Sequence, residues 1–130
     1  MKLNTTSQYA IRIMEFIAKD SKTLYNAKTI SEELSIPYKY LTKIMTQLIE
    51  VNFLKSIRGR EGGYLLLEKP ENIKILDILE SVKECIDQKN CLLGMGLCNA
   101  TKKCSMHDMW EKPKKEIINM FKGTTLNELI

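Results

Sequence analysis

The chain has 130 residues, of which 44% are hydrophobic and 28% charged, and its formal net charge is +4 at pH 7. These proportions are ordinary for a soluble globular protein of one domain, or for one compact DNA-binding unit with an appended helix. No long apolar run occurs, which excludes a transmembrane helix, and the first residues lack the apolar segment of a secretory signal. We therefore expect a cytoplasmic protein with no membrane partner, whose four cysteines are metal ligands or redox groups rather than disulfides.

The excess positive charge lies in the first half of the chain. Residues 1–69 carry eight Lys and three Arg against seven acidic residues, whereas residues 70–130 carry nine Lys against nine acidic residues. A basic half suits a DNA-binding surface, although a charge of this size is also common in domains that do not bind DNA.

The first predicted element is a helix over residues 6–19, where apolar side chains recur at helical spacing. Thr5 and Gln8 have the spacing of a capping box, in which the hydroxyl accepts from an orphan backbone N–H and the amide reaches back to the cap residue. We therefore expect Thr5 to cap this helix.

Two more helices are predicted before residue 52. The second runs from its N-cap, Asn26, to Leu34. Proline has a fixed φ and no N–H, which suits the first turn of a helix, so Pro37 is expected to start a third helix. Two short helices joined by a tight turn favour a helix-turn-helix motif.

The polar face of the third helix has the composition of a DNA-reading surface. Lysine donates to phosphates, and threonine can contact base edges or a thymine methyl group. A solvated polar face is the simpler interpretation, and a tyrosine beside the apolar stripe can pack inward. The side chains expected to contact DNA are Tyr38, Lys39, Tyr40, Thr42 and Lys43.

A β-hairpin is predicted next, with strands at residues 53–57 and 64–67 and a glycine-rich loop at residues 58–63. Glycines allow positive φ and a close approach of the backbone, so we include Gly62 among the DNA contacts. Arg58 and Arg60 on a thin loop can enter a narrow minor groove. A solvated turn is the alternative, but the position directly after a helix-turn-helix favours a wing. The predicted fold class is therefore mainly α with a small β-hairpin wing.

A fourth helix is expected from Ile75 to Glu84, and periodicity then fails over residues 86–103. Cys91, Cys98 and Cys104 lie within or just beyond this stretch and are followed by His107, the only histidine of the chain. Ser105 and Asp108 have the spacing of a second capping box, which would place Cys104 at a helix N-terminus, where thiolate is stabilised.

Three interpretations of this cysteine group are open. The cysteines can be unrelated, but then their proximity to the only histidine is a coincidence. A structural zinc site with three Cys and one His is chemically possible, although a Cys-x2–4-Cys knuckle is missing. Wider spacings on a glycine-containing loop suit an iron–sulfur cluster, which we favour, and Cys85 is interpreted as a small buried apolar residue. No catalytic motif accompanies them, so we do not expect an enzyme.

Taken together, these motifs resemble the IscR/NsrR (Rrf-two) family of winged-helix iron–sulfur transcription regulators, and the IscR branch in particular. The resemblance runs nearly end to end. The segments that carry it are residues 1–10, the turn and helix at 36–48, the wing at 58–65, the cysteine group with His107 and Trp110, and the ending at 125–129.

The resemblance implies a homodimeric repressor that binds a double-stranded DNA operator and controls genes of iron–sulfur cluster assembly. Residues 1–69 would form the winged helix-turn-helix domain, and residues 70–130 the cluster-binding loop and the dimerisation helices. The implied ligands of a 2Fe–2S cluster are Cys91, Cys98, Cys104 and His107. The alternatives are a nitric-oxide- or redox-sensing regulator with a 4Fe–4S cluster, a carrier of iron–sulfur clusters, and loss of any cluster on purification.

The chain departs from the family pattern in three places. Six residues separate Cys91 from Cys98, where five are common. Gln8 stands where nitric-oxide-sensing relatives tend to carry an Asp ligand, which favours the form ligated by His107. Pro113 removes an N–H from the expected long helix, so we predict a kink or break between Trp110 and Pro113, with helix resuming to Phe121 and ending at Gly123.

Overall fold

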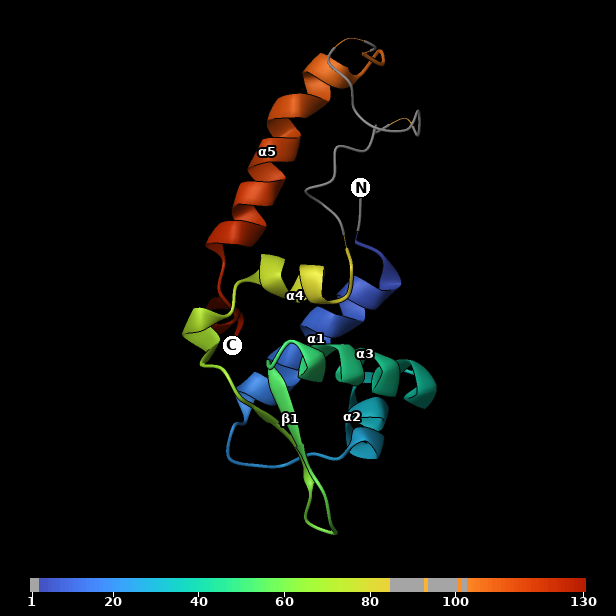
Figure 1. Cartoon of the computed structure of the whole chain (residues 1–130), viewed down its shortest axis with the longest axis vertical. Coiled ribbons are helices and arrows are strands. Elements are labelled where there is room, and N and C mark those ends of the chain that lie inside the picture. Colours follow the sequence, from blue (N-terminus) through green and yellow to red (C-terminus); the bar gives the residue numbers. More distant parts are fainter. Residues whose placement is uncertain (1–2, 85–92, 94–100, 102) are drawn as a thin grey trace.

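The computed structural model describes residues 3–84, 93, 101 and 103–130. It is mainly helical with one two-stranded antiparallel hairpin, as predicted (Figure 1). Within the described residues, no helix has both the length and the apolar character needed to cross a membrane. The elements are α1 (Thr5–Lys19), α2 (Ala27–Leu34), α3 (Tyr38–Glu50), β1 (Leu54–Ile57), β2 (Gly63–Leu66), η1 (Pro70–Asn72), α4 (Ile75–Ser81), α5 (His107–Gly123) and η2 (Leu126–Leu129).

The N-cap of α1 is Asn4, so the predicted capping box of Thr5 and Gln8 is wrong. The Asn4 Oδ1 accepts from the backbone N–H of Ser7 at 2.8 Å. The Gln8 amide instead donates to the Leu3 carbonyl at 2.7 Å. Asparagine is at least as good an N-cap as threonine, and α1 therefore begins at Thr5.

One or two residues after the ends of α2, α3 and α4, the chain passes through a residue in the left-handed region that is not glycine: Ser35 (φ 54), Asn52 (φ 62) and Lys83 (φ 63). Each is followed by an N–H that closes a six-residue loop of the Schellman type. Because glycine usually marks this position, Lys83 gives no signal in the sequence. The predicted end of the fourth helix at Glu84 is therefore wrong. The closing bonds run from Ile36 to Ser31 (3.0 Å), from Phe53 to Leu48 (3.1 Å) and from Glu84 to Leu79 (2.9 Å).

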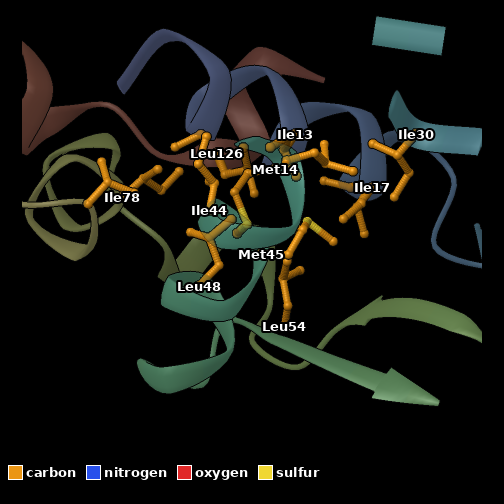
Figure 2. Close-up of a cluster of buried hydrophobic side chains, with 14 of the residues drawn as sticks. Ile13, Met14, Ile17, Ile30, Ile44, Met45, Leu48, Leu54, Ile78 and Leu126 are labelled. Carbon is orange, nitrogen blue, oxygen red and sulfur yellow. The ribbon is translucent and has the colours of Figure 1, made fainter. Parts of the chain in front are cut away.

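The core lies where α1, α3 and α4 meet, and Figure 2 shows its side chains converging from these helices. The apolar side chains that recur at helical spacing on α3, Leu41, Ile44, Met45 and Leu48, are completely enclosed, which leaves the opposite face of α3 toward solvent. Residues from beyond position 70 share this same core. Fully buried members include Ile13, Met14, Ile44, Leu48, Leu54, Ile78 and Leu126.

The helix α5 projects from this body with its C-terminal end beside α4 and its N-terminal end farthest away (Figure 1). It is continuous from His107 to Gly123 with Pro113 inside it, so of the predicted kink or break the break is wrong and the kink stays a prediction, whereas the end at Gly123 is confirmed. Proline at an interior position removes one backbone hydrogen bond, to the carbonyl of Met109. The turns on both sides of Pro113 remain helical despite that loss.

Candidate nucleic-acid interface and metal centre

The turn between α2 and α3 is held by side chains as well as by backbone. Asn26 caps α2 as predicted, because its Oδ1 accepts from the N–H of Thr29 at 2.8 Å. The hydroxyl of Ser31 donates to the Ile36 carbonyl at 2.5 Å. Pro37 was predicted to start α3, but it is the N-cap, and the first helical residue is Tyr38. These bonds fix α3 at a tight turn after α2, as a helix-turn-helix requires.

The polar face of α3 is open to solvent. Tyr38 is 55% exposed and Tyr40 40% exposed, and the side chains of Lys39 and Lys43 are also exposed. Thr42 is partly buried, and its hydroxyl donates to the Lys39 carbonyl at 3.1 Å. Thr42 therefore offers its methyl group and an acceptor oxygen, rather than a proton, to any partner.

Tyr40 leans toward α1 despite its exposure. Its hydroxyl lies 2.6 Å from the Thr6 Oγ1. Its ring meets the ring of Tyr9 edge-on, with centroids 5.5 Å apart. Tyr40 therefore has partners within the protein. It was predicted from the sequence as a DNA contact, with inward packing as the alternative.

The predicted hairpin is present, with strand pairs from Leu54–Leu66 to Ile57–Gly63. Tyr25 adds a short third pairing, because its carbonyl accepts from the N–H of Tyr64 at 3.1 Å. The hairpin extends from the body on the side away from α5 (Figure 1). Arg58 and Arg60 are exposed at its tip, as a wing requires.

The adjacent glycines of the hairpin are required by the protein's own backbone. A Cβ on Gly62 would lie 2.0 Å from the Ile57 carbonyl oxygen, and one on Gly63 would lie 2.6 Å from that of Tyr25. Gly62 was predicted as a DNA contact, and a close approach does occur there, but to Ile57. Gly63 was not predicted from the sequence as a position that requires glycine. The adjacent pair Gly62–Gly63 was the signal that could have indicated it.

The cations of this surface form no ion pairs with the described residues. Within the part of the chain that the structure describes, the ion pairs are those of Lys19, Lys103 and Lys115. Burial, and then the neighbouring Tyr38 phenol, raise the pKa of Tyr64 at the base of the hairpin, so Tyr64 stays neutral. Among residues 3–84, 93, 101 and 103–130, no acidic group pairs with Lys39, Lys43, Arg58 or Arg60.

Two of the predicted metal ligands, Cys91 and Cys98, lie outside the described residues. Cys104 is a partly buried thiol that forms no disulfide with any described residue. His107 is the first residue of α5, and its N–H donates to the Cys104 carbonyl at 3.1 Å. One backbone turn therefore carries both a thiol and an imidazole, and the chemistry of this donor pair fits an iron–sulfur cluster.

The capping box predicted for Ser105 and Asp108 is wrong. The N-cap of α5 is Met106, with no side-chain cap. The Asp108 carboxylate instead pairs with the Lys103 ammonium at 3.2 Å, which draws it from the cap position. His107, Asp108 and Glu111 place their ligand atoms within 4.8 Å of one another. Their spacing along one helix accounts for that proximity, and carboxylates suit hard cations rather than a cluster.

Comparison with known proteins decides the family. The family model described as "Rrf2: Iron-dependent Transcriptional regulator" matches residues 3–130. The chain belongs to the Rrf2 family. This confirms the resemblance found in the motifs, and it identifies the chain as a DNA-binding transcriptional regulator rather than an enzyme.

Individual Rrf2 relatives match over the whole chain. A putative HTH-type transcriptional regulator of Aquifex aeolicus is 32% identical over 132 residues, covering 100% of this chain and 92% of the relative. The regulator IscR of Klebsiella pneumoniae is 30% identical over 131 residues, covering 100% of this chain and 80% of IscR.

Solved structures of Rrf2 regulators share the fold. The global cysteine regulator CymR of B. subtilis has a TM-score of 0.83 at 25% identity, covering 99% of this chain and 95% of CymR. IscR of T. potens has a TM-score of 0.76 at 25% identity, covering 99% of this chain and 85% of that chain. The winged-helix fold class with a C-terminal helix is thereby confirmed.

Proposed function

We propose that this chain is a homodimeric repressor that senses iron–sulfur cluster status and binds the operators of cluster assembly genes. The observation that carries the DNA-binding part is the open polar face of α3 beside a projecting hairpin, with exposed cations on both and no ion pair among described residues to neutralise them. Family membership supports the same reading.

In this proposal α3 enters the major groove and the hairpin tip enters a flanking minor groove. Lys39 and Lys43 contact phosphates, while Arg58 and Arg60 use the enhanced negative potential of a narrow minor groove. Two copies of α3 in a dimer would read half-sites about 34 Å apart at a pseudo-palindromic operator. The residues of the first half of the chain, 1–69, supply these contacts.

The proposed cluster is of the 2Fe–2S type, held by Cys91, Cys98, Cys104 and His107. When bound, such a cluster would make the protein responsive to the supply of iron and to redox conditions, because both determine whether the cluster is present and which oxidation state it has. The similarity to IscR and the thiol–imidazole pair at the start of α5 support this ligand set. The Gln8 amide donates to the Leu3 carbonyl and is a poor iron ligand, which favours His107 over residue 8.

A dimer through α5 is supported by the side chains that this helix leaves uncovered. None of the described residues of α5 is buried. Its large apolar side chains include Met109, which is 68% exposed, and Met120, which is 54% exposed. Trp110, Ile117 and Ile118 are only partly buried. An amphipathic helix of this length whose apolar side chains stay uncovered is typical of a surface that a second subunit covers.

A regulator that senses redox or nitric oxide, with a 4Fe–4S cluster, is the second candidate. The structural similarity to CymR, described as the global cysteine regulator of B. subtilis, shows that the fold is not confined to IscR, which supports keeping this candidate. A cluster carrier would have no use for exposed cations on a reading helix, so that alternative is less well supported.

Anaerobic purification followed by absorption spectroscopy, iron assay and acid-labile sulfide assay tests the sensor. We expect a coloured protein whose spectrum changes in Cys104→Ala and His107→Ala. A colourless protein with stoichiometric zinc would overturn cluster sensing. If Cys104→Ala changes the spectrum and His107→Ala does not, His107 is not a ligand and the proposed ligand set is wrong. The iron and sulfide content per chain then separates a 2Fe–2S cluster from the 4Fe–4S cluster of the second candidate.

Binding to a duplex carrying the promoter of the chain's own gene tests the DNA contacts. Arg60→Ala should lower operator affinity by about tenfold, because a minor-groove contact of about 1–3 kcal/mol is lost. Lys122→Ala removes the same charge from the exposed end of α5 and is the matched control. Equal losses in the two variants would indicate a non-specific charge effect and contradict the wing assignment.

A further inference from the structure

The first turns of α1 hold both helices of the helix-turn-helix. Thr6 contacts the Tyr40 hydroxyl of α3 at 2.6 Å, and Tyr9 packs edge-on against the Tyr40 ring. Arg12 lies over the Tyr9 ring at 5.9 Å and donates to the Leu34 carbonyl at the end of α2 at 2.7 Å. Residues three apart share a helix face, so one face of α1 faces the reading unit.

The Tyr40 contacts constrain α3 in a way that its core packing does not. The neighbouring Leu41 is fully buried, and burial of this side of α3 sets which broad face is open to solvent, but apolar contacts are non-directional and permit small rotations of a helix about its axis. A hydrogen bond depends strongly on angle and distance. The Thr6–Tyr40 bond, made from outside the buried stripe, therefore resists small rotations of α3 and refines the angle at which its exposed side chains face the DNA.

The same end of α1 also contacts Glu84, the residue that precedes residues 85–104, which contain all four cysteines and are called the cysteine segment below. Asn4 caps α1 with its Oδ1 and donates from its Nδ2 to a carboxylate oxygen of Glu84. The Asn4 backbone N–H lies 3.5 Å from the other oxygen of Glu84. Glu84 follows the turn that ends α4, and Cys85 is the next residue. Figure 1 shows the start of α1 beside the end of α4.

We propose that the first turns of α1 position the reading helix and couple it to the cysteine segment. Tyr40 is a positioning residue that acts through Thr6 and Tyr9 rather than an operator contact. Asn4 connects this unit to Glu84, so a displacement of Glu84 reaches the α1 cap and, two residues later, Thr6. The coupling part rests on the proposed cluster sensing, whereas the positioning part does not.

A double-mutant cycle on cluster-free full-length protein tests the positioning role. Tyr40→Phe removes only the hydroxyl, and Thr6→Val removes its partner with little change of shape. We expect each variant to bind the promoter duplex three- to tenfold more weakly, and the double variant to lose no more than the weaker-binding single variant. The salt dependence of binding should not change, because no phosphate contact is lost.

Thr6→Ser keeps the hydroxyl and is the matched control, for which near-wild-type affinity is expected. Thermal unfolding of each variant identifies a loss of folded protein, and affinities are compared per folded molecule. If Tyr40→Phe weakens binding while Thr6→Val does not, Tyr40 contacts the operator directly and the proposal is overturned. Unchanged affinity in both variants overturns it as well.

A second experiment tests the coupling through Asn4. Asn4→Asp keeps the cap oxygen but removes the donor and places two carboxylates face to face. The ratio of operator affinities between cluster-loaded and cluster-free protein should fall at least threefold toward one. Glu84→Gln retains an acceptor for Asn4 and should preserve the ratio.

An unchanged ratio in Asn4→Asp would refute the coupling. A wild-type ratio of one would refute both the coupling and the proposed cluster sensing, and the positioning role would still be decided by the Tyr40 cycle. The two failures are therefore distinguishable.

Discussion

The backbone N–H of Leu126 donates to the carbonyl of Ile73 at 2.8 Å, and both side chains are fully buried. A second bond, from the N–H of Ile75 to the Thr124 carbonyl at 2.9 Å, closes the same junction. The chain that leaves α5 therefore pairs with the segment that enters α4. The helix that carries His107 is attached to the core of the DNA-binding unit at its C-terminal end.

This junction predicts a large loss of stability on truncation of Leu126. Leu126→Ala should lower the free energy of unfolding by about 2–5 kcal/mol, because it leaves a cavity in the core. Leu129→Ala is the matched control, since Leu129 is 37% exposed and should change stability by less than about 1 kcal/mol. Urea titration measures both. Equal effects would show that the end of the chain does not stay docked in solution.

The hairpin predicts an intolerance of side chains at its adjacent glycines. Gly62→Ala and Gly63→Ala should each lower thermal stability and operator affinity, because the new Cβ would meet backbone oxygens at 2.0 and 2.6 Å. Gly123→Ala is the control, as nothing lies within 4 Å of its Cβ. Alanine there should be neutral or stabilise by about 0.5–1 kcal/mol. Wild-type binding by Gly62→Ala would contradict the close backbone approach at the hairpin.

The hydroxyl of Ser7 is buried in α1 without a hydrogen-bond partner among the described residues. Burying a polar group without a partner costs free energy, so Ser7→Ala should leave stability unchanged or raise it by about 1 kcal/mol. Ser31→Ala should lower it by about 1 kcal/mol, because the Ser31 hydroxyl donates to the Ile36 carbonyl. Chemical denaturation of the two variants checks the sign. A clear loss in Ser7→Ala would reveal a partner for that hydroxyl.

In the loop after α1, the pKa of Asp20 depends on two neighbouring side chains. Side-chain hydrogen bonds from Thr23, and then from Tyr25, lower the pKa of Asp20 below its usual value of 3.8. A lowered folded-state pKa contributes stability that is present above the unfolded value and lost as pH falls through the folded one. Thr23→Val should therefore raise this pKa more than Tyr25→Phe does, as followed by NMR titration. The reverse order would contradict the hydrogen bonding described.

Local chemistry was enough to predict most of the DNA-binding half. Asn26 caps α2 as expected because a side-chain oxygen before an apolar repeat satisfies an orphan N–H wherever the helix sits. The tight turn before Pro37 and the hairpin at the glycine pair follow from equally local limits on backbone angles. These features depend on residues only a few positions apart. The cysteine group was one of the motifs that together carried the family resemblance, and its ligand set stays a prediction.

Features that depend on distant contacts could not be predicted in this way. The hydroxyl of Tyr40 meets Thr6 across 34 positions, and Asn4 meets Glu84 across 80. The left-handed turn at Lys83, just after α4 ends at Ser81, carries no glycine that would have marked it. The helix α5 continues without a break through Pro113, although proline alone predicts an interruption. The sequence by itself determined which segments form helices, turn and wing, because those choices are made within a few residues. Only the tertiary structure decided the partners of Tyr40, Asn4 and Leu126, because a hydrogen bond or a buried contact between remote residues exists only once the core has brought them together.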